Sequence, residues 1–467
     1  MRVLAWPALL WMAWLPFAQA QVAPLASEQA AVHLLNRIAY GPAPGDIERV
    51  RQMGAQRYID SQLQPEALAL PATLKERLAA LDTAQAPAGD VLAAFQSARA
   101  LAKEGEEGKQ RSRAILQKIT NQAAEARIAR AVASPRQLEE VMVDFWFNHF
   151  NVFAGKGQDR ALVASYERDA IRPHVFGTFR ELLGATAKHP AMLFYLDNWL
   201  SKSGALNENY ARELMELHTL GVDQGYAQQD VTELARMLTG WTYAPRRMEG
   251  SDNGFRFDAK RHDQGAKRWL GRDIRPQGQD EGEYALDVLA MHPATARHVS
   301  YQLAQYFVQD APPPALVERM ARTWQDRGGD IRAVLRTLFA SAEFMAPETQ
   351  GAKFKTPYRY VISAARAGAL ALDDVQPALG ILARLGMPLY GCQTPDGYKN
   401  TQQAWLNPDA LGRRIGFAAQ LGKTLDAGAL QVTLGGAISG RTRDLVAASP
   451  EPLRAAMLLG SPDFMQY

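Results

Sequence analysis

The sequence contains only one cysteine, Cys392, among its 467 residues. One cysteine cannot form an intramolecular disulfide, and it cannot build a thiolate cage around a metal ion. A lone cysteine can act as a nucleophile, but it is more often a small buried apolar side chain. Disulfide scaffolds and cysteine-based metal sites are therefore excluded.

A strong excess of one charge is also missing. The chain has 52 Lys and Arg residues against 49 Asp and Glu residues, and it has no polybasic run. Proteins that bind nucleic acid usually have a basic patch or stripe. We therefore expect no nucleic-acid partner.

Long apolar runs are absent except at the N-terminus. Met1-Arg2 gives a short positive start, Val3 to Phe17 is apolar, and Ala18-Gln19-Ala20 is an A-x-A cleavage site. This pattern predicts a signal peptide over residues 1–20, cleaved after Ala20. The alternative is an uncleaved anchor, but the run is short for a membrane span and no basic stop-transfer cluster follows it. We expect a periplasmic or secreted protein with no membrane span after signal cleavage.

Strand-like alternation is scarce, whereas helix signals are frequent. Thr356-Pro357 places a capping residue before a proline at the first helical position, where the missing N–H costs nothing. His189-Pro190 and His292-Pro293 are similar helix openings. The best strand candidates, Phe255–Phe257 and Gln431–Leu434, are short. The sequence predicts a mainly α, multi-helix globular protein with at most one or two short β pieces.

Three regions are expected after the signal peptide. Residues 21–135 form an N-terminal helical region, in which two glycines within Lys103–Arg113 favour a break in a long polar helix. Residues 136–350 form a motif-bearing helical core, and residues 351–467 a C-terminal helical region with a loop platform. One continuous domain over 21–467 is the alternative, because a chain with 47% hydrophobic residues can bury a large core.

Familiar catalytic templates are absent from the sequence: it contains no G-x-S-x-G, P-loop, H-E-x-x-H or C-x-x-C motif. Instead, residues able to bind metal or transfer protons alternate with large apolar residues between Leu138 and Leu270. The motifs are Phe145 to Phe150, His189 to Met192, Tyr195 to Trp199, Asn207 to Glu213, Glu216 to Gly221 and His262-Asp263.

These motifs resemble the bacterial family catalogued as domain of unknown function 1800 (DUF1800), over the range from about Leu34 to Leu421. The motifs Gly386 to Tyr390, Thr394 to Tyr398 and Ala404 to Pro408 fit the same pattern. The resemblance implies an exported bacterial protein without an assigned activity, often encoded beside an exported protein that looks like a sulfatase or phosphatase relative. That neighbourhood implies work on an extracellular polymer, such as a glycan, or assembly with a sulfatase-like partner. It assigns no catalytic residue.

His149 is the first candidate for chemistry. Met142 and Phe145 lie on one stripe of a predicted helix, and His149 continues that stripe, so its side chain is expected to point inward. A lone inward histidine is more often a core residue bonded to a backbone carbonyl. Asp144, about one turn earlier, and the histidines downstream favour a functional site.

The range Asn207–Gly221 is predicted to be a helix that is capped by its first residue and stopped by its last. Glu213 and His218 flank the buried stripe of this helix, about 140° apart. That spacing does not form a chelate like H-E-x-x-H, so a shared site would need other elements. The alternative for Glu213 is a partly buried ion pair with Arg212 or Arg236.

His262-Asp263 lies in a glycine-rich, charged segment that is predicted to be a loop. A loop can bring an imidazole and a carboxylate into a cleft, as ligand and supporting group or as base and orienting group. Adjacent residues in an extended segment point apart, which argues against a direct pair. If the loop Thr394–Trp405 folds over His149, His218 and His262, it would complete a cleft.

The catalytic candidates are therefore His149, Glu213, His218, His262 and Asp263, and the three histidines are also candidate ligands of a divalent metal ion. The oxygen donors Asp197, Asn198, Asn207, Glu208 and Asn209 leave two alternatives open, a Ca²⁺ or Mg²⁺ site and a pair of helix caps.

Two hypotheses about function follow. In the first, the protein is an exported metal-assisted or acid/base enzyme that acts on an envelope or extracellular polymer. In the alternative, it is a non-catalytic helical scaffold or a partner of a sulfatase-like exported protein. A cleft that gathers two of the histidines and one carboxylate would favour the enzyme.

Overall fold

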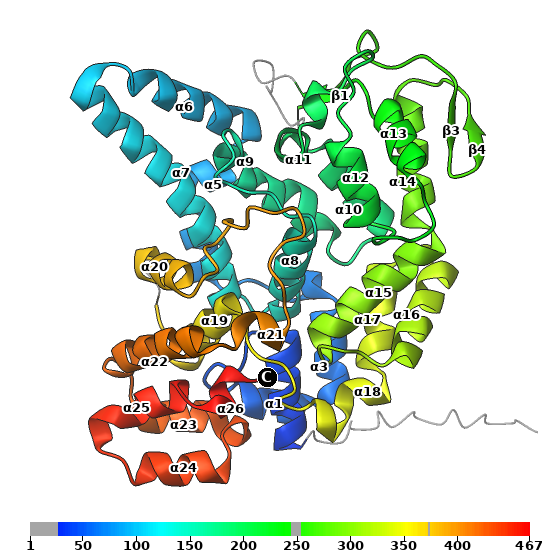
Figure 1. The fold of residues 1–467 in the computed structure, drawn as a ribbon. Helices are drawn as coiled ribbons and strands as arrows, with labels where there is room; N and C mark the ends of the chain where they lie inside the picture. The colour runs from blue at the N-terminus through cyan, green and yellow to red at the C-terminus, as the bar shows by residue number, and fades with distance from the viewer. Residues whose placement is uncertain (1–26, 244–253, 372–373) are drawn as a thin grey trace, which may run out of the picture.

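The computed structural model describes residues 27–243, 254–371 and 374–467. Helices dominate these ranges, and the strands form two small two-stranded sheets (Figure 1), which confirms the predicted mainly α fold. No helix in these ranges is both long enough and apolar enough to cross a membrane. The predicted signal peptide, residues 1–20, lies outside the described residues.

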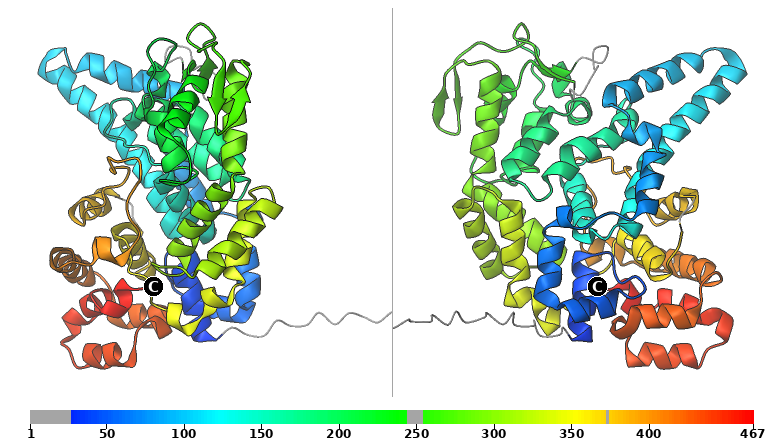
Figure 2. Two further views of the ribbon diagram at one scale, coloured as in Figure 1. Left: turned by 45° about the vertical axis from the view of Figure 1, so that its right-hand side comes forward. Right: turned by 180° about the vertical axis from the view of Figure 1, so that it is seen from behind.

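The N-terminal region combines short helices with a long helical hairpin. Its elements are α1 (Glu28–Ile38), α2 (Asp46–Met53), α3 (Ala55–Gln62), η1 (Pro65–Ala67), α4 (Ala72–Ala79), α5 (Asp82–Gln85), α6 (Ala88–Leu101) and α7 (Gly105–Ala133). The chain turns back between α6 and α7, close to the break predicted near Lys103–Arg113, and the two helices pack together. Figure 2 shows the hairpin projecting from the body of the protein.

The middle region contains the strands and the helices of the candidate site. Its first elements are α8 (Gln137–His149), α9 (Asp159–Ser165), the π-helical turn η2 (Tyr166–Ile171), η3 (Arg172–His174), α10 (Phe179–Lys188), α11 (Pro190–Tyr195), η4 (Asn198–Leu200), α12 (Asn209–Glu216) and α13 (Gln228–Met237). The remaining elements are β1 (Trp241–Tyr243), β2 (Phe255–Phe257), β3 (Lys267–Trp269), β4 (Arg272–Ile274), α14 (Gln279–Ala290), α15 (Pro293–Phe307), α16 (Pro314–Asp326), α17 (Ile331–Phe339), α18 (Ala342–Met345) and η5 (Pro347–Thr349). Both sheets are antiparallel, with Trp241 opposite Phe257 and Lys267 opposite Ile274. The strand predicted at Phe255–Phe257 is confirmed.

The C-terminal region consists of helices. They are α19 (Pro357–Ala367), α20 (Gln376–Arg384), α21 (Gln402–Trp405), α22 (Pro408–Gly422), α23 (Ala427–Leu434), η6 (Gly435–Ala437), α24 (Gly440–Ala447), α25 (Glu451–Leu459) and α26 (Pro462–Met465). The strand predicted at Gln431–Leu434 is wrong, because these residues end α23. The Asp426 carboxylate caps that helix by accepting the N–H of Ala429 at 2.6 Å. Leu430 and Leu434 are both buried, at the i,i+4 spacing of a helix.

The three predicted helix openings at X-Pro pairs are confirmed. Thr356, His189 and His292 each accept a hydrogen bond from a backbone N–H two or three residues further on, and proline follows each of them. An imidazole nitrogen accepts a hydrogen bond only when it is unprotonated. Burial lowers the pKa of His189 to about 3 and also lowers the pKa of the less buried His292.

A buried guanidinium joins the three regions. Arg127 on α7 lies 2.5 Å from a carboxylate oxygen of Asp144 on α8 and 3.2 Å from one of Glu167 in η2. Tyr390, which follows α20, donates its hydroxyl to Glu167 at 2.9 Å. Burial by itself raises the pKa of Glu167, but the charges of Arg127 and Arg172 lower it below its usual value. Glu167 is therefore a charged partner of Arg127, and burial raises the pKa of the Tyr390 hydroxyl that bonds to it.

We expect His189→Asn to weaken the pH dependence of stability. Below its ordinary pKa of 6.5 the histidine is protonated in the unfolded chain, whereas in the folded protein it stays neutral down to about 3. The unfolded state therefore binds more protons as the pH falls from 7 to 5, and the free energy of unfolding decreases. At about 1.4 kcal/mol per pKa unit, this histidine accounts for about 2 kcal/mol at pH 5.

Asparagine keeps a capping acceptor but does not titrate. The free energy of unfolding, measured with urea, should decrease from pH 7 to pH 5. We expect this decrease to be about 2 kcal/mol smaller in His189→Asn than in the unchanged protein. His292→Asn is the matched control, because it changes the same kind of cap at a less buried position and should have a smaller effect. An unchanged pH difference in His189→Asn would contradict this account.

Candidate functional site

Two stripes of side chains, one on α8 and one on α15, line a single cleft of about 370 Å³. Spacings of three and four residues place the members of each stripe on one side of their helix. Ligand sites usually enclose roughly 300–1,000 Å³, so this α8–α15 cleft has room for a small ligand or a segment of a larger one. The α8 side chains are Asp144, Phe145, Asn148 and His149, and the α15 side chains are His298, Gln302, Gln305 and Tyr306.

The loop 394–405, here called the platform loop, closes one side of the cleft. The Asn148 amide donates to the carbonyl of Tyr398 at 2.9 Å, and its oxygen accepts the N–H of Tyr398 at 2.7 Å. Gly397 has a φ of +68°, and a Cβ there would lie 2.3 Å from the backbone oxygen of Asn148. Only glycine allows this approach. The loop therefore folds back over the end of α8 (Figure 1), and its residues line the cleft together with His149.

His149 lies on the inner wall of the cleft. Its Nε2 is 3.1 Å from the backbone carbonyl oxygen of His218, and since a carbonyl only accepts, Nε2 is the protonated nitrogen. Burial, with a smaller contribution from His298, lowers the pKa of His149 to about 4, so this imidazole is neutral at neutral pH. The ring of His218 lies in the core between Phe150 and Tyr210 and does not line the cleft.

His298 is the second histidine of the cleft, and the sequence analysis missed it. Burial lowers the pKa of His298, and a hydrogen bond to the carbonyl of Leu217 opposes the shift. Its buried Nε2 has no hydrogen-bond partner in the described part of the chain. The nitrogen that faces Leu217 is therefore Nδ1, and a donating Nδ1–H leaves the lone pair of Nε2 unused. The i,i+4 pair of His298 and Gln302 on a helix opened by Pro293 was the signal that could have revealed this site.

Carboxylates gather beside the two histidines. Glu216 and Asp396 line the cleft, and Glu213 lies next to them on α12. Burial and then the charge of Glu216 raise the pKa of Glu213, which favours its protonated form. Neither Arg212 nor Arg236 pairs with Glu213 in the described ranges: Arg212 pairs with Glu208 and Glu216, and Arg236 with Glu233 and Asp263.

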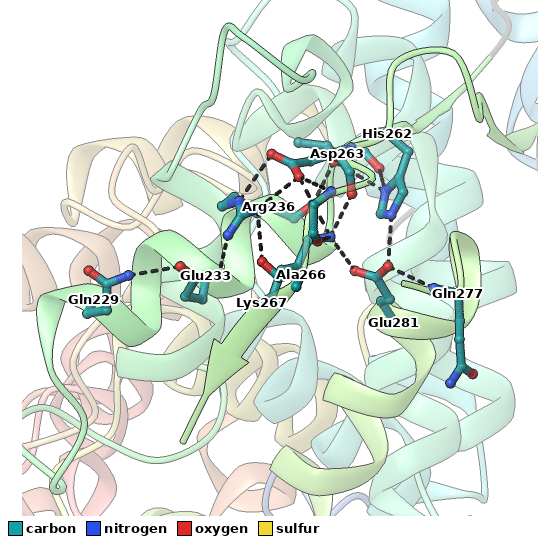
Figure 3. A network of polar contacts seen from close by, with 11 residues as sticks. Gln229, Glu233, Arg236, His262, Asp263, Ala266, Lys267, Gln277 and Glu281 are labelled. Carbon is teal, nitrogen blue, oxygen red and sulfur yellow. Dashed lines mark hydrogen bonds and ion pairs between the residues drawn. The ribbon is translucent and has the colours of Figure 1, made fainter. Parts of the chain in front are cut away.

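His262 and Asp263 belong to a different, buried network (Figure 3). His262 places Nε2 3.2 Å from Glu281 and Nδ1 2.9 Å from the carbonyl oxygen of Thr239. The Lys267 ammonium lies 2.8 Å from the other oxygen of Glu281. Burial raises the pKa of Glu281, but hydrogen bonds from His262 and Lys267 outweigh it and lower the pKa below its usual value.

Asp263 is held in the same network by Arg236, which donates to both of its oxygens at 3.0 and 3.1 Å. These hydrogen bonds lower the pKa of Asp263. Both ring nitrogens of His262 are thus bonded, and so is the Asp263 carboxylate. The network fastens the loop before β3 to α13 and α14, and neither residue lines the α8–α15 cleft.

The histidines do not share a metal site. His149 and His218 are neighbours, with ring centroids 6.1 Å apart, whereas His262 is bonded to Glu281. Within the described ranges, no group of three or more His, Cys, Asp and Glu side chains is arranged to hold a metal ion. The three-histidine site considered from the sequence is therefore not assembled, because its members face different neighbours.

The oxygen donors between α11 and α12 are occupied by protein groups. Asp197 pairs with Lys156 at 2.9 Å, and the Asn198 amide donates to the carbonyls of Leu238 and Trp241. Asn207 accepts the N–H of Asn209, and Glu208 accepts from Arg212, Gln228 and Thr232. Of the two predicted caps, only Asn207 accepts an N–H at the start of α12; Asp197 and Glu208 do not cap the helices that follow them.

Comparison with known proteins adds one finding. A model of the family described as "Protein of unknown function (DUF1800)" matches residues 33–466, nearly the whole chain. This match confirms the resemblance predicted from the motifs. No curated protein and no solved structure matches the chain.

The buried Lys267–Glu281 pair should contribute far more to stability than an exposed pair on the same hairpin. We expect Glu281→Gln to lower the free energy of unfolding by about 3–5 kcal/mol, because the Lys267 charge is left buried without its partner. Asp273→Asn breaks the exposed Arg268–Asp273 pair and should cost less than about 1 kcal/mol. Urea unfolding of both variants measures the difference, and equal losses would show that the Glu281 network is not a structural one.

Proposed function

This chain belongs to the DUF1800 family, whose function is unknown, and we propose that it is an acid–base enzyme with its active site in the α8–α15 cleft. The observation that supports this most is His298, a neutral imidazole whose Nε2 has no hydrogen-bond partner in the described ranges. It lines a cleft together with His149, Glu216 and Asp396. Two histidines and two carboxylates thus meet in one place.

His298 is the general base of the proposed reaction. A neutral imidazole accepts a proton from an attacking water, and positioned side chains of this kind contribute about 10²–10⁴-fold to the rate. Because burial lowers the pKa of His298 below 6.5, the ring remains unprotonated at neutral pH. A neutral imidazole has one basic nitrogen, and Nε2 is the proposed one because it has no hydrogen-bond partner in the described ranges.

Glu213 is the general acid. Its raised pKa favours the protonated carboxyl, and the nearby charge of Glu216 contributes to that shift. In hydrolysis, the water oxygen bonds to the substrate and its proton passes to His298, while the leaving oxygen takes the proton of Glu213. Proton exchange with solvent then restores both groups.

The other candidates act as positioning or structural groups. His149 donates Nε2–H to the His218 carbonyl and contacts Gln302, so it orients the inner wall of the cleft. His218 contributes its backbone carbonyl. His262 and Asp263 stabilise the neighbouring hairpin through Glu281 and Arg236.

The proposed substrate is a polyhydroxylated polymer, such as an envelope or extracellular glycan. Amides and hydroxyls both donate and accept hydrogen bonds, as sugar hydroxyls do. An aromatic ring, Tyr398, lies beside them and suits the apolar face of a sugar. The polar neutral side chains in the lining are Asn148, Gln302, Gln305, Thr356, Asn400 and Thr401.

We also propose export to the periplasm or the medium, on the basis of the predicted signal peptide. The A-x-A motif that ends at Ala20 places the new N-terminus at Gln21. N-terminal sequencing of the protein from the periplasm and culture medium would test this, and an intact Met1 in the cell-bound protein would contradict it.

The acid–base proposal is tested by hydrolysis of a glycan panel. Peptidoglycan fragments and chito-, cello-, malto- and xylo-oligosaccharides are incubated with the protein, and products are detected by mass spectrometry. For a hydrolysed glycan, His298→Ala and Glu213→Gln should each lower kcat by about 100-fold or more. His174→Ala is the matched control, because His174 lies outside the cleft, and it should keep full activity.

Circular dichroism establishes that each variant is folded. Because burial lowers the pKa of His298, the loss of activity toward acid pH should occur at a lower pH than for a histidine of ordinary pKa. No hydrolysis of any glycan, or equal rates in His298→Ala and the unchanged protein, would contradict the proposal.

A second candidate function is a non-catalytic scaffold that binds a sulfatase-like exported protein. Four large apolar side chains on α22 to α25, each more than half exposed, favour this function. Contiguous exposed apolar side chains are typical of surfaces that bind other proteins. The four residues are Ile415, Val432, Leu445 and Leu453.

If the protein is a scaffold, substitutions on α22 to α25 should impair its function, and substitutions in the α8–α15 cleft should not. A Val432→Lys/Leu453→Lys variant should lose co-purification with a sulfatase-like protein encoded beside it, because it places charge on an apolar contact. His298→Ala should retain the complex. Co-purification that is lost only in His298→Ala would contradict the scaffold.

A further inference from the structure

A second cavity, of about 300 Å³, lies along α15 from the α8–α15 cleft, and His298 lines both. This second cavity, here called the Tyr301 cavity, is lined by Tyr301, Pro312, Pro314 and Val317, among others. Tyr301 is 42% exposed and is the one aromatic residue among the exposed large apolar residues of the described ranges. The imidazole of His298 therefore lies between two cavities, each large enough to bind a small ligand.

The turn after α12 also borders both cavities. Leu217 and Val222 line the α8–α15 cleft, and Leu220 and Gln224 line the Tyr301 cavity. Gly221, between them, has a φ of +94°, and a Cβ there would lie 3.2 Å from Nδ1 of His298. The turn packs against the imidazole because this residue has no side chain. The two cavities are thus neighbours at the place where His298 packs against the turn after α12.

We propose that the Tyr301 cavity is a second subsite for the same polymer, so that an extended polyhydroxylated chain runs along α15 and passes beside His298. This inference rests on the proposed function. It assigns to Tyr301 the role of a stacking platform, because an aromatic face binds the C–H face of a sugar ring. The residues Pro312 and Pro314 extend that apolar surface.

The rim of the Tyr301 cavity is polar. Arg297 and Glu318 form an ion pair at 2.7 Å, and Gln224 adds an amide. These groups donate and accept hydrogen bonds, as the sugar hydroxyls around a stacked ring require. An apolar floor with a polar rim is the usual composition of a ligand site.

The position of His298 between the subsites has a consequence for cleavage. A chain that fills both cavities places an internal bond, rather than a terminal one, beside the base. Binding should therefore strengthen with chain length until both cavities are filled, and the products should come from internal cleavage.

The test measures binding of the full-length protein to fluorescently labelled oligosaccharides of two to eight sugars. One series is β-1,4-linked N-acetylglucosamine and the other is α-1,4-linked glucose. The variants are Tyr301→Ala, Tyr301→Phe and His298→Ala. For at least one series we expect affinity to rise with length, and Tyr301→Ala to weaken the longest ligand about tenfold, or ~1.4 kcal/mol, while the shortest is unaffected. Tyr301→Phe keeps the aromatic face and should bind normally.

The outcomes separate the two proposals. Binding that depends on His298 but not on length or on Tyr301 overturns the second subsite and leaves the proposed function in place. A loss that is equal for all lengths in Tyr301→Ala, or a loss that Tyr301→Phe does not rescue, also overturns the stacking role. If neither series binds, the second subsite is overturned, whereas the proposed function is decided by hydrolysis of the glycan panel.

Discussion

The buried charge of Arg127 is the constraint on which the site depends. A guanidinium removed from water needs carboxylates on several sides, and removing one partner of such a pair typically costs about 3–5 kcal/mol. Here the partners come from α8 and η2, and Tyr390 bonds to Glu167 from the C-terminal region. Asp144 has two roles, because it pairs with Arg127 and also lines the α8–α15 cleft. There the hydroxyl of Tyr306 on α15 donates a hydrogen bond to Asp144 at 3.2 Å. The two cleft helices are thus held in place by one interior charge.

The platform loop is fixed at several points, although it has little secondary structure. Asn148 holds Tyr398 by two hydrogen bonds, as a strand neighbour would. Further along, buried Lys353 pairs with Asp310 and donates to the carbonyl of Asn400 at 2.8 Å. Backbone groups that find side-chain partners in this way can form a rigid cleft wall. The loop therefore positions polar groups of the cleft with only one short helix, α21 (Gln402–Trp405), at its end.

The sequence was sufficient to predict those features of the structure whose physical cause is local. Helix caps such as Thr356-Pro357 and the inward direction of His149 follow from neighbours within one or two turns. The strand predicted from the alternation in Gln431–Leu434 was wrong, because alternation over four residues does not distinguish a strand from the end of a helix. His262 was placed with the catalytic candidates because its partners, Glu281 and Thr239, are distant in sequence. His298 was missed although its i,i+4 spacing with Gln302 is a local signal, because the cleft that gives this pair its meaning is completed by α8 and the turn after α12, which are distant in sequence.

The chemistry of a histidine in this fold is decided by how many of its ring nitrogens the protein already uses. His262 has both nitrogens bonded, so it has no lone pair or proton to exchange with a substrate. His189 uses one nitrogen as a helix cap, and burial encloses its ring in the core. His298 alone combines a neutral ring, a cavity on each side and an Nε2 without a hydrogen-bond partner in the described ranges. A polar atom left without a partner at a cavity wall costs free energy, commonly about 1–3 kcal/mol, unless a ligand or water bonds to it. The Nε2 atoms of His189 and His218 also have no hydrogen-bond partner in the described ranges, so the two cavities beside His298 are the physical reason to place the chemistry there.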